Sequence, residues 1–95
     1  GSPDFRARAA AVRVLVAWRD RVPGVLDLLQ AAVNDEHPRV RLLAVWGLSY
    51  FTGPDVARAM EVSVESLIHP QDDYLTYALN ETTKTLERRA KEAGK

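Results

Sequence analysis

Residues 34–48 read NDEHPRVRLLAVWGL. This stretch begins with polar turn residues, passes through a proline, and continues as an apolar run with helical spacing. Proline is tolerated in the first turn of a helix because its missing N–H group would have no partner there. The stretch therefore predicts a turn followed by a helix that begins at Pro38.

The same pattern occurs earlier in the chain at a constant offset. Arg8 lies 33 residues before Arg41, and Leu15 lies 33 residues before Leu48. An offset of this size is typical of proteins built from stacked helical hairpins. We therefore expect the matching helices to pack in equivalent ways. The same offset relates three further pairs: Ala11 and Ala44, Val12 and Val45, and Trp18 and Phe51.

Proline and glycine divide the whole chain into apolar stretches with helical spacing. Pro23, Pro38, Pro54 and Pro70 each precede such a stretch, and each predicts a helix start. No stretch alternates apolar and polar residues as a strand would. The expected fold is all-α, a short α-α superhelix of about five antiparallel helices, because short connections place sequential helices side by side. The expected helices cover residues 4–18, 23–33, 38–50, 54 onward and 72–89.

Apolar residues spaced three or four apart predict the buried face of each helix. The predicted stripes are Ala11, Val12, Leu15 and Trp18 in the first helix; Val25, Leu26, Leu29 and Val33 in the second; Val40, Ala44, Leu48 and Phe51 in the third; Val56, Met60, Val64 and Leu67 in the fourth; and Leu75, Leu79, Thr82 and Leu86 in the fifth.

Length and composition limit the classes of protein that fit. The 95 residues suit one domain over residues 1–95. Thirteen basic and thirteen acidic residues give a formal net charge of zero, whereas a duplex-binding module usually carries a basic excess. The chain has no cysteine, which excludes thiolate metal sites and a cysteine nucleophile. No apolar run approaches the roughly 20 residues of a membrane span, so we expect no membrane segment.

The two ends of the chain carry separate expectations. Gly1 and Ser2 resemble a cloning linker, so residues 1–3 are expected to be a tag or linker and the chain to be part of a larger protein. Residues 90–95 are rich in charge and are predicted to form a frayed tail. A short piece of a helical stack leaves an apolar end face uncovered. We therefore expect dimerisation through an end helix, either the first or the fifth.

Residues 34–48 resemble a HEAT repeat. In that family an Asp in the turn is followed six residues later by an Arg in the second helix, and Asp35 and Arg41 match this spacing. A turn carboxylate accepts hydrogen bonds from N–H groups at a helix start, and an Arg can reach the carboxylate of its own or a neighbouring repeat. Pro38 starts the second helix, and Arg8 occupies the equivalent Arg position one repeat earlier. The resemblance implies a structural motif of Asp35, Pro38, Arg41 and Arg8.

A wider resemblance covers most of the chain. The stretches 14–20, 35–48, 67–70 and 74–82 are similar to the HEAT segment of large multidomain bacterial proteins described as membrane-bound dehydrogenases. Those proteins carry a propeller-like domain before the HEAT segment and a c-type cytochrome domain after it. The resemblance implies a non-catalytic protein-interaction or structural spacer module in an extracytoplasmic redox protein. Its partners would be another protein or neighbouring domains of the same chain.

Arginines and aromatic residues are the candidates for partner binding. In HEAT arrays the second helices line the concave face, and Arg6, Arg13 and Arg39 belong to such helices here. An arginine row of this kind fits a nucleic-acid-binding module. The nearby Asp20, Asp35 and Glu36 instead favour arginines that pair with turn carboxylates or stay solvated. Trp46 lies off the main stripe and is either an interface anchor or a contact with the next hairpin. The candidate partner-binding residues are Trp46, Arg39, Arg13 and Tyr50.

The polar residues suggest no catalytic, metal or cofactor site. His37 and His69 each precede a proline one repeat apart, which separates them by about 10 Å, whereas the ligands of one ion lie about 2 Å from it. Both are best interpreted as polar turn residues. Asp72 and Asp73 suit the positive end of a helix dipole. Because the sequence also lacks phosphate-binding and metalloprotease motifs, we expect the chain not to be an enzyme.

Overall fold

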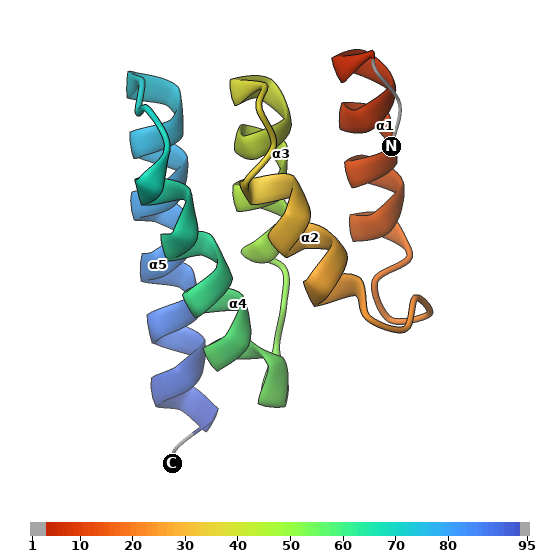
Figure 1. Cartoon of the computed structure of the whole chain (residues 1–95). Helices are drawn as coiled ribbons and strands as arrows, with labels where there is room; N and C mark the ends of the chain where they lie inside the picture. The colour runs from red at the N-terminus through yellow and green to blue at the C-terminus, as the bar shows by residue number, and fades with distance from the viewer. Residues whose placement is uncertain (1–3, 94–95) are drawn as a thin grey trace.

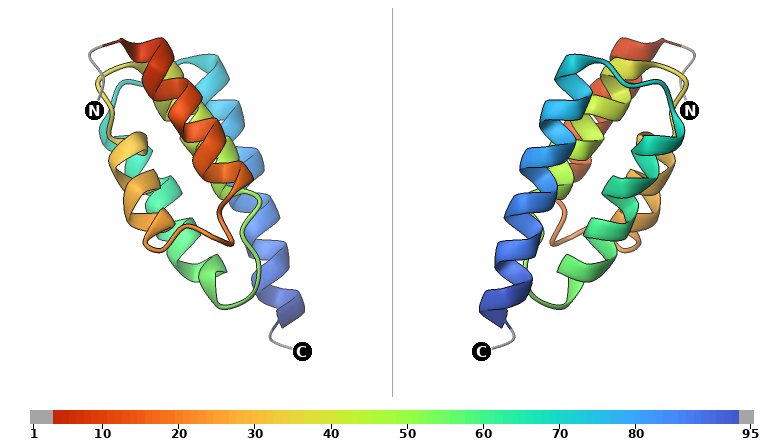
Figure 2. Two further views of the ribbon diagram at one scale, coloured as in Figure 1. Left: turned by 90° about the vertical axis from the view of Figure 1, so that its right-hand side faces the viewer. Right: turned by 90° about the vertical axis from the view of Figure 1, so that its left-hand side faces the viewer.

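The computed structural model describes residues 4–93, which form two layers of helices without a strand (Figure 1). One layer contains α1 (Phe5–Ala17), α3 (Pro38–Leu48) and α5 (Asp73–Ala93), and the other contains α2 (Val25–Val33) and α4 (Val56–Val64) (Figure 2). α2 and α3 form one antiparallel hairpin, and α4 and α5 form the next. The all-α superhelix expected from the sequence is therefore confirmed. Residues 1–3, the expected tag or linker, lie outside the described residues.

The core lies between the two layers and includes aliphatic side chains from all five helices of residues 4–93. The stripes predicted for α3 and α5 are fully buried, and that of α2 is buried apart from the half-buried Leu26. Thr82 is the polar member of the α5 stripe. Its hydroxyl donates to the carbonyl oxygen of Val45 at 3.1 Å, so it ties α5 to α3 without leaving a buried donor unpaired.

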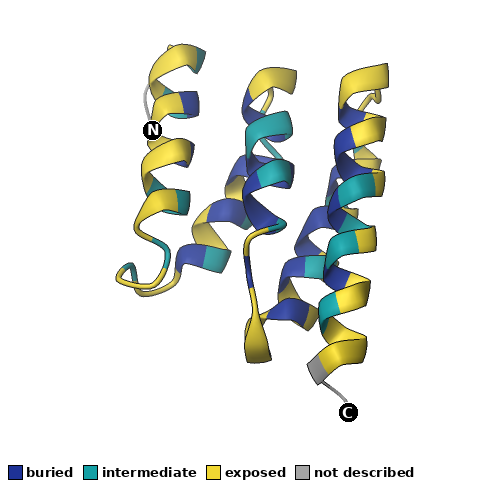
Figure 3. Ribbon diagram, turned by 180° about the vertical axis from the view of Figure 1, so that it is seen from behind, coloured by how far each residue is buried: buried dark blue, intermediate teal, exposed yellow. Residues whose placement is uncertain are grey.

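The predicted stripe of α1 is wrong in part. Val12 is buried and Leu15 is partly buried, but Ala11 is exposed and 52% of Trp18 is exposed. The residue that joins Val12 in the core is Ala9. α1 packs on α3 along one side only, because among the described residues no helix precedes it, and its other side is open (Figure 3). Apolar residues on that open side remain in contact with solvent.

The predicted stripe of α4 is also wrong in part. Val56 is buried, but Val64 and Leu67 are exposed. The buried face instead carries small residues, namely Ala59, Val62, Ser63 and Ser66. The helix tightens into a 3-10 helix, η2 (Glu65–Ile68), after Val64, which changes the residue spacing and turns the later apolar side chains outward.

Of the four prolines predicted to start a helix, three do not start an α-helix. Pro38 occupies the first turn of α3 as predicted, with His37 as its N-cap. Pro23 lies in a turn and α2 begins two residues later, because Gly24 adopts a left-handed φ of 71° that is accessible to glycine. Pro54 belongs to a 3-10 helix, η1 (Gly53–Asp55), and Pro70 lies in the loop before α5. The fixed φ of proline suits turns as well as helix starts.

Two helix ends also differ from expectation. α3 ends at Leu48 and not at residue 50. α5 continues to Ala93, so residues 90–93, expected to form a frayed tail, belong to this helix. Arg89 stabilises this region, since its guanidinium donates to the carbonyl oxygens of Ser49 and Phe51 just beyond α3. These carbonyls have no partner within α3, and Arg89 supplies one.

Candidate partner-binding face

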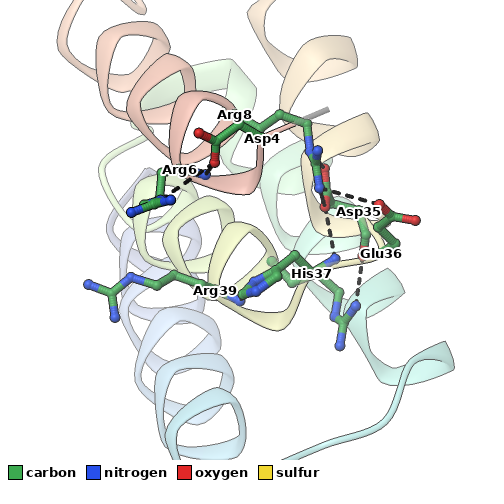
Figure 4. A network of polar contacts seen from close by, with 8 residues as sticks. Asp4, Arg6, Arg8, Asp35, Glu36, His37 and Arg39 are labelled. Atoms are coloured by element: carbon green, nitrogen blue, oxygen red, sulfur yellow. Dashed lines mark hydrogen bonds and ion pairs between the residues drawn. The ribbon is translucent and has the colours of Figure 1, made fainter. Parts of the chain in front are cut away.

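Asp35 joins α1 to the turn before α3. Arg8 of α1 donates from Nε to Asp35 Oδ2 at 2.8 Å and from Nη2 to Asp35 Oδ1 at 3.0 Å (Figure 4). This two-bond geometry is the strongest way in which arginine binds a carboxylate. Both side chains are largely shielded from solvent, whereas Glu36, 3.6 Å from Arg8, is exposed.

The same aspartate also organises its own turn. Asp35 Oδ1 accepts a hydrogen bond from the backbone N–H of His37 at 2.9 Å. Arg41 is buried and donates from Nη1 to the carbonyl oxygen of Asp35 at 2.7 Å, so it binds the backbone and not the carboxylate. His37 Nδ1 accepts from the backbone N–H of Arg39 at 3.1 Å, and the His37 ring stacks on Phe5 at 3.7 Å between centroids. The four residues of the sequence motif therefore meet around this turn.

The surroundings of Asp35 favour its ionised form. Burial alone would raise the pKa of its carboxyl, but the hydrogen bonds from Arg8 and from the His37 N–H outweigh burial and hold the pKa below the ordinary value of 3.8. The hydrogen bond to Asp35 correspondingly raises the pKa of the Arg8 guanidinium. Arg8 and Asp35 therefore remain a charged pair across the neutral pH range.

Replacing Asp35 by Asn tests this pair through its pH dependence. A carboxyl with a lowered folded-state pKa stabilises the fold above the unfolded-state pKa, and this stabilisation is lost as pH falls through the folded-state pKa. Asp35→Asn should be less stable than wild type by about 1 kcal/mol at pH 7, a value reduced for partial exposure. The difference should shrink as pH falls below 3.8. Urea unfolding at several pH values measures it.

Glu36→Gln is the matched control, because Glu36 is 87% exposed and lies farther from Arg8. We expect this variant to follow wild type closely at every pH. A gap between Asp35→Asn and wild type that stayed constant down to pH 2 would contradict the role assigned to the Asp35 charge.

A groove runs along the seam between α1 and α3, on the side facing away from α2 and α4. One hollow of about 450 Å³ is lined by apolar parts of α1 and α3 together with Trp46, Tyr50, Arg13 and Arg19. Gly47 also lines this hollow, and a Cβ atom there would overlap a methyl group of Val16. Glycine at this position therefore lets the two helices approach closely.

A second hollow continues the groove toward the start of both helices. Its lining includes Arg6, Arg39 and again Arg13, so the two hollows share one arginine. The structure thus brings Trp46, Tyr50 and Arg13 together in one hollow and places Arg39 in the next. Figure 4 shows Arg39 extending away from the Asp35 turn.

The arginines of the groove differ in their partners. Within residues 4–93, neither Arg13 nor Arg39 forms an ion pair with a carboxylate. Arg6 lies 3.6 Å from Asp4, and both side chains are mostly exposed. Arg19 donates to the carbonyl oxygen of Val16 at 2.7 Å and lies 5.5 Å from the centroid of the Tyr50 ring.

Sequence reasoning missed two members of this face. Arg19 lies just past the end of α1, outside the helical pattern, and nothing in its spacing links it to Tyr50. Tyr77 of α5 meets the edge of Trp46 at 6.1 Å between ring centroids and is 61% exposed. Trp46 therefore contacts the next hairpin, as one interpretation of its position predicted, and it also lines the groove.

Other polar residues of the sequence analysis have local structural partners. His69 Nε2 lies 2.8 Å from Asn34 Oδ1, which links the second hairpin to the turn of the first. Asp72 Oδ1 accepts from the backbone N–H of Leu75 at 2.7 Å at the start of α5. Among residues 4–93, no three His, Asp or Glu side chains are grouped as metal ligands would be.

Comparison with known proteins gives one family. The family described as HEAT repeats matches residues 1–82, which is most of the chain. No curated protein and no solved structure matches it. Within the described part of the chain, no helix combines the length and apolar character of a membrane span. HEAT repeats generally mediate protein interaction or scaffolding and are typically non-catalytic. Together with the paired helices and the shared turn aspartate, the match shows that this chain belongs to the HEAT-repeat family.

Proposed function

We propose that the chain is a non-catalytic protein-interaction module that binds its partner in the groove between α1 and α3. The groove itself carries the proposal, because it combines an apolar floor with Trp46 and Tyr50 at its surface. Aromatic residues and arginine are the residue types that contribute most to protein interfaces. Tyr50 is 55% exposed, so a partner would bury substantial aromatic area there.

Selection from a random peptide-display library tests this function. We expect the wild-type chain to enrich peptides whose binding is lost on Trp46→Ala, since removal of a central aromatic anchor typically weakens binding by 2 kcal/mol or more, roughly thirtyfold. Tyr74→Ala is the matched control, because Tyr74 is 78% exposed on α5 and does not line the groove. If the enriched peptides bound Trp46→Ala as tightly as wild type, the binding site would lie elsewhere and the proposal would be wrong.

Nucleic acid is the alternative partner, because Arg13 and Arg39 lack carboxylate partners among residues 4–93. The zero net charge and the apolar floor of the groove favour protein. Titration of a labelled duplex at low salt decides between them. Salt-sensitive binding that is lost on Arg13→Gln would favour nucleic acid, and absence of binding at low salt would end that alternative.

We propose a multidomain redox protein as the setting of this module, on the strength of the sequence resemblance to dehydrogenase-associated HEAT segments. The segment would then act as a spacer or docking arm outside the cytoplasm. The open reading frame around these residues tests the setting. A haem-attachment CxxCH motif downstream and a signal peptide upstream would support it. A long helical array with no other domain would remove it.

We propose that a second copy of the chain covers the open side of α1. The equivalents of Ala11, Leu15 and Trp18 in the next repeat are all buried, namely Ala44, Leu48 and Phe51. Ala11 and Leu15 instead border a hollow of about 510 Å³, and Trp18 is exposed. The second half of α5 instead carries charged side chains, namely Lys84, Glu87, Arg88 and Lys91, and its exposed Tyr74 and Tyr77 lie near its start. We therefore place the self-association on α1.

Sedimentation equilibrium checks this dimer. We expect a concentration-dependent dimer that is lost on Val14→Glu, because Val14 is 58% exposed on the open side of α1 and a charge there would be buried at the interface. Arg88→Glu on α5 should leave the association unchanged. A wild-type chain that stays monomeric at about millimolar concentration would rule the dimer out.

A further inference from the structure

The groove between α1 and α3 has a strongly uneven charge, although the chain as a whole is neutral. Four arginines contribute to the lining of its two hollows, and no aspartate or glutamate does: Arg6, Arg13, Arg19 and Arg39. Arg6 lies 3.6 Å from Asp4, whereas Arg13, Arg19 and Arg39 form no ion pair with a carboxylate of residues 4–93. The positive charge of the groove is therefore not neutralised by its own lining.

The position of the charges relative to the apolar floor is specific. Trp46, Leu43 and Val16 line the main hollow, and Arg13 lines both hollows. Arg19 lies near Tyr50 at one end of the groove, and Arg39 lies at the other. A ligand that fills the floor would therefore meet a cation at each end and one midway.

We infer that the partner segment is acidic and carries a bulky apolar side chain between its carboxylates. The apolar side chain would rest against Trp46, and carboxylates on both sides of it would pair with Arg19, Arg13 and Arg39. Arginine suits this role because its planar fork binds a carboxylate with two parallel hydrogen bonds. This inference rests on the proposed protein-binding function and adds the chemistry of the partner.

Three peptide-display libraries distinguish the contribution of peptide charge to binding affinity from the contribution of the apolar side chain. Their apolar positions are randomised identically, and the other positions are Asp or Glu in the first, Asn or Gln in the second, and Lys or Arg in the third. We expect the best acidic peptides to bind about tenfold more tightly than the best neutral ones, since exposed charge pairs contribute modestly and additively. This preference should weaken at high salt. Titration in a Trp18→Phe background reports binding through Trp46 fluorescence alone.

Charge-neutral variants of the groove complete the test. The double variant Arg13→Gln/Arg39→Gln should lower the affinity for acidic peptides to that for neutral ones. The control double variant Arg58→Gln/Arg88→Gln changes arginines of α4 and α5 outside the groove, so it should leave the affinity for acidic peptides unchanged. Neutral and acidic peptides that bind equally, with both affinities lost on Trp46→Ala, would overturn the inference but leave the proposed function standing. Binding that is indifferent to Trp46 would overturn both. Displacement of the acidic peptides by a single-stranded oligonucleotide that binds more tightly would also overturn the inference, because the groove would then be a nucleic-acid site.

Discussion

Leu48→Ala should lower the free energy of unfolding by about 3 kcal/mol, and the melting temperature by more than about 10 °C. Leu48 has no exposed surface and belongs to the core between the two layers. Its removal loses the transfer free energy of the deleted atoms and also leaves a cavity, because helices held by neighbours on both sides cannot close it. Urea unfolding followed by far-ultraviolet circular dichroism measures the loss.

Leu67→Ala makes the same chemical change at a position that is 56% exposed in η2. The loss of stability there should stay within about 0.5 kcal/mol. Equal losses in the two variants would mean that Leu48 is not in the core as the structure places it. The comparison tests the packing itself, because the deleted atoms are identical.

Gly47→Val should destabilise the chain by about 3 kcal/mol, since a close-packed contact leaves no room for added side-chain atoms. Even the Cβ atom would overlap Val16 of α1, and valine adds two further carbons. A change of rotamer would not relieve this overlap at low cost, because β-branched side chains in helices have one strongly preferred rotamer. Either α1 moves away from α3 or Val16 leaves its rotamer, and both results distort the groove.

A double-mutant cycle makes this prediction specific. Val16→Ala alone should lower stability, because it removes partly buried methyl groups. Added to Gly47→Val, the same change should raise stability, because it removes the atoms that the new side chain strikes. Such a reversal of sign corresponds to a coupling free energy of more than about 1 kcal/mol. Additive effects of the two substitutions would show that Gly47 and Val16 do not limit the approach of the helices.

The sequence predicted the central hairpin well, because its helices have neighbours on both sides. Every apolar position of the α3 stripe is buried. Periodicity identifies one face of a helix, and in α3 that face meets the core. The Asp35 turn was predictable from its local motif, although the contact with Arg8 joins it to α1, 27 residues earlier.

The errors have a physical cause in each case. Trp18 matches the buried Phe51 by offset, yet it is exposed because α1 has no preceding helix among the described residues. The buried face of α4 consists partly of Ser63 and Ser66, which no hydrophobic pattern detects. The groove depends on how closely α1 and α3 approach each other. The one sequence feature that indicates a close approach is the glycine at position 47. Contacts such as that of Arg19 with Tyr50 require three-dimensional placement.

The single-sided attachment of α1 has a dynamic consequence. Its ties to the remainder of the stack include the Arg8 pair with Asp35 and the close contact of Val16 with Gly47. Amide hydrogens of α1 should therefore exchange with solvent through a partial opening that leaves α3 and α5 folded, as terminal units of linear arrays do. Amides of α3 should exchange only through global unfolding. Because α1 forms one wall of the groove, the same opening would set how fast a bound segment is released.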